Sequence, residues 1–385
     1  MNAVAQTLFN NLSALVVVVN AKGEVEFVSP SVERMLGFEP AQLLGTAWWE
    51  LTRQSQKESI ELKQNAIEMA NSFELSVIPP YERVLINSFG EQKHILWNTA
   101  KSPDNKLVGI GYDITERKVI ERKLQQKNAE LEIKNAELLQ SIRYAKRLQQ
   151  AILPSVDIIT RHVSDAFVLY QPKDIVSGDL YFICEQDNKL LVAAIDCTGH
   201  GVSGALMSVM ANNLLKQVIA KVGVNSPAEL LQELDVALYE SINRGQKEIK
   251  SDGMDVALAI FDLQNKSLLF AGAFRPFYLI RNNELTEFSG SKYPVGFYSG
   301  VTKTFETINL KLEYNDQLYF FTDGYIDQFG GENDKKFTKK RFKDLLLSAA
   351  QMEMDEQESF LEYAFNNWKQ NGEQTDDILV IGVKV

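Results

Sequence analysis

The stretch KLLVAAIDCTGHG, residues 189–201, joins a continuous apolar run to an aspartate and a glycine-containing turn. Runs of Val, Ile and Leu of this length are typical of β-strands, and helix-forming residues 202–222 follow directly. Similar runs recur through residues 154–385, and several follow one another without an intervening helix. This order favours antiparallel sheets covered by helices over a doubly wound parallel sheet. We therefore predict an α+β fold for this part of the chain.

The predicted elements of residues 154–385 are strand-like runs rich in Val, Ile, Phe and Tyr, and four helical blocks. The predicted strands are DAFVLYQ, KLLVAAID, DVALAIFDL, SLLFAGA, FYLIRNNEL, DQLYFFTDG and DDILVIGVKV. The predicted helices cover residues 202–222, 227–243, 339–350 and 355–371.

The first 117 residues form a separate β-rich segment. We expect a short helix at AQTLFNNL, then a tight hairpin in which Lys22-Gly23 joins SALVVVVN to EVEFVS. Short helices are expected near residues 32–36 and 40–44. Three further strand-like runs follow, which are SFELSV, KHILWNTAK and LVGIGYDI.

Residues 118–153 link the two segments and contain no Gly or Pro. A heptad pattern places Leu124, Leu131, Leu138, Ala145 and Ile152 at position d, and Asn128, Asn135 and Ile142 at position a. Leu at d with a buried Asn at a is typical of a parallel two-stranded coiled coil, because the Asn fixes register. Lys127 and Glu132 would form an interchain pair at g and e. We expect a homodimer; the alternative is a single solvated helix packed on a neighbour.

Composition excludes several functional classes. The net charge of −11 argues against binding to nucleic acid or acidic membranes, which requires a basic surface. Cys184 and Cys197 are too few for a disulfide framework, and no Cys/His cluster indicates zinc. The apolar run at residues 14–19 is too short to cross a bilayer and lacks a preceding positive charge. We therefore expect a cytoplasmic chain without membrane insertion.

A set of aspartates flanks the predicted strands at glycine-containing turns. Carboxylates at rigid strand ends can converge, and hard divalent cations prefer such oxygen ligands. For any one of these residues the alternative is a simple turn former, since Asp-Gly is a common turn pair. The set as a whole indicates a carboxylate metal site made from Asp179, Asp196, Asp323 and the pair Asp376-Asp377.

The third segment resembles the SpoIIE-like branch of the PPM (type 2C) metal-dependent serine/threonine phosphatases, the branch that includes the RsbU and RsbP regulators. The resemblance covers nearly all of residues 147–385. It is carried, in family order, by QQAILPS, QPKDIVSGDLYF, AAIDCTGHGVSGALMSVM, SDGMDVALAIFD, AGAFRPFYLIR, YPVGF, YFFTDGYIDQFGG, KKRFKDLL and TDDILVIGVKV.

This resemblance implies an αββα sandwich in residues 154–385, with two Mn²⁺ or Mg²⁺ ions at one edge. Carried over residue by residue, the metal-site carboxylates are Asp179, Asp196, Asp323 and Asp376, and the backbone carbonyl of Cys197 is a further ligand. Asp377 stays an alternative to Asp376, because the Asp-Asp pair leaves the register open by one. The family-typical stretch at residues 252–255 reads as mainly structural; the alternative is that Asp255 lies near the metals.

Two positions depart from the pattern of eukaryotic PPM members. Asp174 stands where those members place a phosphate-holding Arg, and Lys173 beside it is not a match. Thr198 stands where they place a His proposed as general acid, and the nearest histidine is His200. A general acid and a loop-stabilising role are both open for His200.

Residues 5–118 resemble a PAS domain. The resemblance is carried by GEVEFVSPSVERMLGFEPAQLLGTAWWELTR, FGEQKHILWNTAK and LVGIGYDITERK. It does not specify a ligand, but the segment lacks the cysteine that blue-light flavin chemistry needs, and its one histidine, His94, reads as an ordinary polar residue rather than a haem ligand. We expect Phe38 and the tryptophans 48, 49 and 97 to pack in the core; the alternative is that they line a pocket.

The combined resemblances imply a signal-regulated protein phosphatase. By family analogy its substrate is a phosphorylated STAS-type anti-sigma antagonist in a bacterial partner-switching pathway. The alternative is a catalytically silent sensor-scaffold that binds a phosphoprotein; retention of the four metal-site aspartates favours the enzyme. A histidine kinase is not supported, because no phosphoacceptor helix follows the PAS-like segment.

Overall fold

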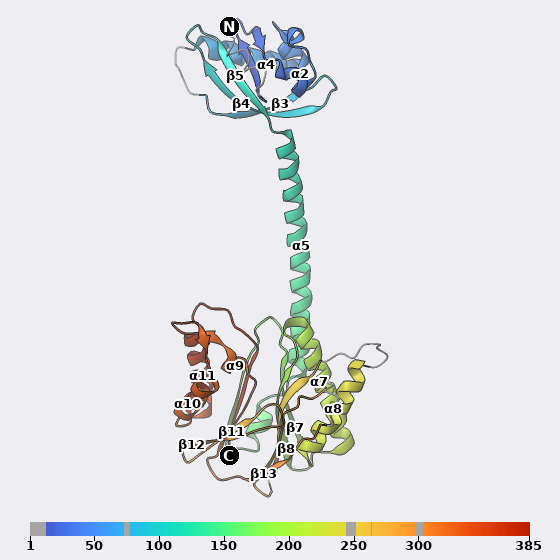
Figure 1. Ribbon diagram of the computed structural model, residues 1–385, viewed down its shortest axis with the longest axis vertical. Helices are drawn as coiled ribbons and strands as arrows, with labels where there is room; N and C mark the ends of the chain where they lie inside the picture. The colour runs from blue at the N-terminus through green and yellow to red at the C-terminus, as the bar shows by residue number, and fades with distance from the viewer. Residues whose placement is uncertain (1–12, 73–77, 244–251, 263, 297–302) are drawn as a thin grey trace. The chain divides into compact units, whose positions relative to one another are not determined.

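The computed structural model describes residues 13–72, 78–243, 252–262, 264–296 and 303–385. The chain divides into two compact units, Met1–Asn135 and Ala136–Val385, and helix α5 (Thr115–Ile152) begins in the first and ends in the second (Figure 1). The three-part division at residues 117 and 153 stays a prediction. In the described part of the chain, no helix combines the length and apolar character that crossing a membrane requires.

The first unit is a five-stranded antiparallel sheet in the order β2-β1-β5-β4-β3, with helices packed on one face. The predicted hairpin is present, with Val17 opposite Val28. Its strands are β1 (Leu15–Val19), β2 (Val25–Val28), β3 (Tyr81–Ile86), β4 (Gln92–Lys101) and β5 (Leu107–Asp113). Its helices are α2 (Ser31–Leu36), the 3-10 turn η1 (Pro40–Leu43), α3 (Ala47–Leu51) and α4 (Gln56–Asn71).

Three elements of this unit were not predicted, namely α3, α4 and β3. Helix α4 is capped at its N-terminus by Ser55, whose side chain accepts a hydrogen bond from the backbone N–H of Glu58, and the helix carries few large apolar residues that would reveal its period. The predicted helix at 5–12 and most of the predicted strand at 72–77 lie outside the described residues.

Helix α5 confirms the long helix expected between the segments. The side chains of Leu124, Leu131 and Leu138 are 58%, 56% and 59% exposed. Three leucines spaced seven residues apart therefore form an apolar stripe that the described chain leaves open. The coiled coil and the homodimer stay predictions.

The second unit is an αββα sandwich, which confirms the expected fold. One antiparallel sheet has the order β13-β10-β9-β8-β7, and the other has the order β12-β11-β14-β17-β6. Their strands are β6 (Asp165–Gln171), β7 (Asp179–Gln186), β8 (Lys189–Cys197), β9 (Met254–Asp262), β10 (Ser267–Ala273), β11 (Phe277–Arg281), β12 (Glu284–Phe288), β13 (Ile308–Lys311), β14 (Gln317–Phe321) and β17 (Ile378–Lys384).

Alternation along the strands divides the apolar side chains between three layers. On β8, Leu191 and Ala193 face the helices α7 (Gly201–Val222) and α8 (Pro227–Asn243), whereas Val192 and Ala194 face the other sheet. The second sheet is covered on its outer face by α10 (Lys339–Ala349) and α11 (Met354–Lys369) (Figure 1). Both sheets are therefore apolar on both faces, which explains their continuous apolar runs.

The run FYLIRNNEL is two strands rather than the single strand expected. Asn282 and Asn283 adopt positive φ of 49° and 64°, and they turn β11 back into β12. Asn tolerates this left-handed conformation, and a pair of such residues is typical of a type I′ hairpin. Strand β7 is also additional to the predicted runs; it begins at Asp179.

Candidate active site

Three aspartates stand side by side across one sheet. Asp196 at the end of β8 lies opposite Asp179 on β7 and opposite Asp255 on β9. Residues directly opposite on antiparallel strands have Cβ atoms about 5 Å apart and point to the same face. Register alone therefore brings three carboxylates together at this sheet edge.

The second sheet adds two carboxylates from neighbouring strands. Asp323 follows β14, and Asp376 precedes β17 by two residues. Both line a pocket of about 340 Å³ with Asp196 and Asp255. The remaining lining residues are Cys197, Thr198, Gly199, His200, Gly253, Met254, Arg275 and Pro294. Strand ends of both sheets thus meet at one opening.

Arg275 joins the carboxylates of the two sheets. Its Nη2 atom lies 2.7 Å from Oδ2 of Asp323 and 3.2 Å from Oδ2 of Asp255, and it also hydrogen-bonds to Asp196. Arg275 is the only lysine or arginine among the described residues that line this pocket. Arg275 is not among the site residues predicted from the sequence, because nothing in the stretch AGAFRP marks its arginine as reaching the opposite sheet.

Burial and mutual repulsion disfavour charge on these carboxylates. Burial raises the pKa of Asp196 to about 7, against the lowering effect of Arg275, and Asp323 and Asp255 raise it further. Burial likewise raises the pKa of Asp255 to about 6, with Arg275 opposing. The pKa of Asp179 is raised well above its usual range by burial and then by the charge of Asp196. The cluster therefore carries more negative potential than Arg275 neutralises.

Asp179 is buried, is not among the described pocket-lining residues, and is held by the second sheet. Its carboxylate accepts a hydrogen bond of 2.6 Å from the hydroxyl of Thr322, the residue before Asp323. The same hydroxyl accepts the backbone N–H of Leu379 in β17. Thr322 therefore fixes the spacing between the two sheets at the site.

Asp377 and Asp376 occupy different environments. The two carboxylate oxygens of Asp377 accept the backbone N–H groups of Lys173 and Gly178, each at 2.7 Å. Asp377 is buried and is not among the described pocket-lining residues, whereas Asp376 is. The structure thus places Asp376 toward the opening and uses Asp377 to anchor the loop before Asp179.

That loop passes close to the one after β8. A Cβ atom on Gly178 would lie 2.5 Å from the carbonyl oxygen of Gly199 and 3.2 Å from that of Cys197. Only glycine permits this approach. The Cys197 carbonyl therefore lies within the site region, as the family resemblance implies for a ligand.

His200 pairs with Asp174 at the rim of the pocket. Its Nδ1 atom lies 3.1 Å from Oδ2 of Asp174, and both side chains are exposed. This pair joins the loop before Asp179 to the start of α7. Asp174, which stands at the family's phosphate-holding position, thus contacts a histidine.

The carboxylate set suits a hard divalent cation in its chemistry. Among the described residues, no three His, Cys, Asp or Glu side chains are placed so that they could hold a metal ion. The guanidinium of Arg275 occupies the centre of the carboxylate cluster instead. Three carboxylates that meet at one cationic nitrogen have the reach to meet at one metal ion. Carboxylate and carbonyl oxygens are the ligands that Mg²⁺ and Mn²⁺ prefer.

The end of α5 contacts the loop that carries Asp179. The buried Gln149 side chain donates hydrogen bonds to the Ser177 carbonyl at 2.6 Å and to the Ser208 hydroxyl at 2.8 Å. Its carbonyl oxygen accepts the backbone N–H of Ser177 at 3.1 Å, and the Ser177 hydroxyl accepts that of Asp179. Two hydrogen bonds thus connect the linker helix to the backbone of Asp179.

Comparison with known proteins agrees with this geometry. The family model described as Stage II sporulation protein E (SpoIIE) matches residues 186–385, just over half of the chain. The model described as PAS fold matches residues 9–119. No curated protein matches the chain.

Among solved structures, the chain is similar to the SiaA-PP2C domain of Pseudomonas aeruginosa. The identity is 30% and the TM-score 0.60, over 65% of this chain and 98% of that one. The PP2C phosphatase domain of SpoIIE from Bacillus subtilis aligns at 19% identity and a TM-score of 0.45, over 57% and 62% of the two chains. The RsbU and RsbW domains of Rv1364c from Mycobacterium tuberculosis align at 19% identity and a TM-score of 0.47, over 57% and 59%. With its PAS fold and its carboxylate-lined sandwich, the chain belongs to the SpoIIE family and is a protein serine/threonine phosphatase.

Proposed function

We propose that this phosphatase is metal-dependent, that its PAS unit controls its activity, and that it hydrolyses phosphoserine or phosphothreonine in a regulatory protein. The observation that carries the proposal is the convergence of Asp196, Asp255 and Asp323 on one cationic atom of Arg275. A cluster that concentrates carboxylates at a pocket floor is suited to divalent cations.

The residues assigned to two Mn²⁺ or Mg²⁺ ions are Asp179, Asp196, Asp323, Asp376 and the carbonyl of Cys197. Asp255 joins this set on the strength of its register with Asp196. Asp377 acts instead as the anchor of the loop before Asp179. Bound cations would supply the Lewis acidity that phosphoric monoester hydrolysis needs.

Arg275 is the candidate phosphate contact. A cation that takes over its carboxylate partners leaves its guanidinium free within the same pocket, and a guanidinium binds phosphate oxygens in a bidentate manner. Arg275 would thus hold the phosphate, a role that the eukaryotic members give to an Arg at the position of Asp174.

The proposed substrate is a phosphorylated STAS-type anti-sigma antagonist of a bacterial partner-switching pathway, on the support of the family resemblance. The proposed assembly is a cytoplasmic homodimer joined through α5, supported by the exposed stripe of Leu124, Leu131 and Leu138. In such a dimer, a change in the PAS units is transmitted along the paired helices to Gln149.

The test is phosphate release from a phosphoserine peptide by the purified full chain, with Mn²⁺, with Mg²⁺ and with EDTA. We expect cation-dependent release that Asp323→Asn and Asp196→Asn reduce by at least about a hundredfold, because each removes a ligand charge. Asp187→Asn is the matched control, since Asp187 is exposed in the β7–β8 turn at the far end of the strand from Asp179. Release in EDTA equal to that with Mn²⁺ would overturn metal dependence, and the absence of release with either ion would favour the silent scaffold.

A further inference from the structure

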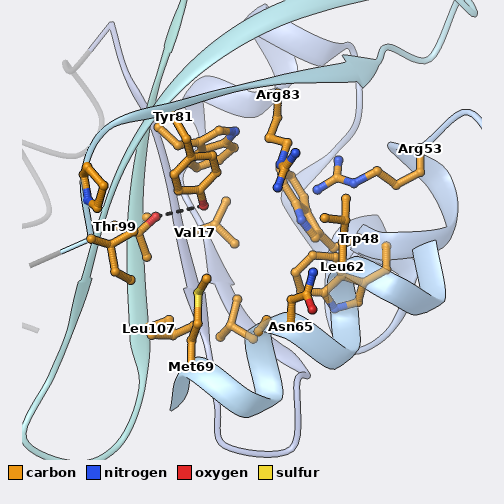
Figure 2. Close-up of a pocket in the computed structure, with 17 residues that line it drawn as sticks. Val17, Trp48, Arg53, Leu62, Asn65, Met69, Tyr81, Arg83, Thr99 and Leu107 are labelled. Carbon is orange, nitrogen blue, oxygen red and sulfur yellow. Dashed lines mark hydrogen bonds between the residues drawn. The ribbon is translucent and has the colours of Figure 1, made fainter. Parts of the chain in front are cut away.

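The first unit contains a pocket of about 300 Å³ between its sheet and helices α3 and α4 (Figure 2). This volume is at the lower end of the range found for small-molecule sites. The tryptophans 48, 49 and 97 belong both to the buried core and to the pocket wall. Core packing and pocket lining, which the sequence left as alternatives, are therefore both true of these three residues. Phe38 packs against the core and does not line the pocket.

Most of the pocket wall is apolar. Trp48 and Trp97 meet edge to face, with ring centroids 6.1 Å apart. Figure 2 shows Leu62 and Met69 from the helical side and Leu107 from the sheet around the same space. Such a wall favours an apolar ligand body.

Two arginines lie together on one side of this wall. The guanidinium groups of Arg53 and Arg83 point toward one another in Figure 2. The guanidinium of Arg53 lies 5.7 Å and 5.6 Å from the ring centroids of Trp48 and Trp49. Two cations held against aromatic rings at one pocket wall repel each other unless an anion lies between them.

The described residues supply little to balance these charges. No Asp or Glu is among the described pocket-lining residues, and neither arginine has an ion pair within the described chain. The Nη1 atom of Arg53 donates to the carbonyl and hydroxyl of Thr52, but its buried Nε atom has no partner among the described residues. Burial lowers the pKa of Arg53 to about 10; the charge of Glu58 opposes this shift, and the charge of Arg83 adds to it.

We propose that this pocket binds a small organic carboxylate, with the carboxylate group between Arg53 and Arg83 and an apolar body against Trp48, Trp97 and Leu107. A carboxylate accepts paired hydrogen bonds from guanidinium groups and supplies the missing negative charge. The apolar body fills the space that the core leaves open. The hydroxyl of Tyr81 is hydrogen-bonded to that of Thr99 at 3.0 Å, so one of these two hydroxyl protons is already used within the wall.

The test is intrinsic tryptophan fluorescence of the full chain titrated with phenylacetate and with octanoate. Three of the four tryptophans line the pocket, so an occupant changes the signal. The matched uncharged probes are phenylacetamide and octanamide. We expect saturable binding of at least one carboxylate, at least tenfold tighter than that of its amide; the better of the two carboxylates identifies the body as aromatic or aliphatic.

Variants separate charge from fold. Arg53→Gln and Arg83→Gln are expected to weaken carboxylate binding at least tenfold, Arg53→Lys less, and the exposed control Arg117→Gln not at all. Ala66→Leu fills the pocket without altering charge and should also abolish binding, with thermal melting used to verify the fold. Equal affinity for acid and amide, or no binding of either carboxylate to the folded chain, would overturn the proposal. These readouts come from the PAS unit, so they do not depend on phosphatase activity.

Discussion

The guanidinium of Arg275 lies 2.7 Å from the carboxylate of Asp323, across the gap between the two sheets of the sandwich. Asp196 and Asp255 contact the same nitrogen from the other sheet. Any divalent cation that binds these carboxylates must displace Arg275 from them. Cation affinity at this site therefore includes the free energy of breaking the Arg275 ion pairs.

We predict that Arg275→Gln strengthens Mn²⁺ binding and weakens the metal-free fold. Without Arg275 the carboxylates repel one another, and losing one partner of a largely buried ionic cluster costs about 2 kcal/mol or more. Isothermal titration should show tighter Mn²⁺ binding by about tenfold. The melting temperature in EDTA should fall by about 4–8 °C.

The control for this variant is Arg281→Gln, which removes an arginine paired with Asp316 and Glu313 away from the pocket. It should leave the Mn²⁺ affinity unchanged. Unaltered Mn²⁺ affinity in Arg275→Gln would show that Arg275 and the cation do not compete.

We also predict that the metal-free protein loses stability as pH rises from 5 to 8. The pKa of Asp196 is raised to about 7 and that of Asp255 to about 6, whereas an unfolded Asp titrates near 3.9. The folded state thus holds protons that the unfolded state has released. The free energy of unfolding therefore falls as pH rises through the folded pKa values.

Melting curves in EDTA check this dependence. Asp196→Asn mimics the protonated side chain at every pH, so the amount by which its melting temperature exceeds that of the parent should grow by about 5 °C between pH 5 and pH 8. Asp187→Asn should show no such divergence. A gap between Asp196→Asn and the parent that stays constant with pH would contradict the prediction.

The sequence predicts the site only where its signals are local. Apolar runs that end in Asp and Gly identify the strand ends at Asp196 and Asp323, because the apolar run and the turn residues both lie within a few positions of the aspartate. The place of Asp255 in the cluster follows from its register opposite Asp196. Its position near the start of a predicted strand is only a weak signal of this in the sequence. Arg275 was not predictable, since its contacts depend on how two sheets pack. Asp376 and Asp377 are adjacent in the sequence and differ only in the folded chain, where Asp377 accepts the backbone N–H of Gly178 and Asp376 lines the pocket.

Dimerisation through α5 is the third prediction. Leu131→Glu with Leu138→Glu places charge on the exposed leucine stripe and should convert the full chain to a monomer in sedimentation analysis, because charged residues at position d disfavour the seam. Ile133→Glu is the matched control, since Ile133 is 63% exposed on the same helix but lies at position f. A dimer that persists in the double variant, or a monomeric parent, would rule out this interface.

The last prediction concerns Gln149, through which α5 reaches Asp179. Gln149→Leu leaves the buried N–H of Ser177 without its partner, which costs about 1–3 kcal/mol, and leaves the Ser177 carbonyl only the 3.5 Å contact from the Ser208 hydroxyl. The loop should then relax, and Asp179 with it, because its backbone N–H is bonded to the hydroxyl of Ser177. We expect at least a tenfold lower kcat and weaker Mn²⁺ binding. Gln150→Leu, which alters an exposed neighbour on the same helix, should change neither quantity. If Gln149→Leu loses stability but keeps the parent's kcat and Mn²⁺ affinity, then Gln149 only supports the fold, and the linker helix must act on the site by another contact.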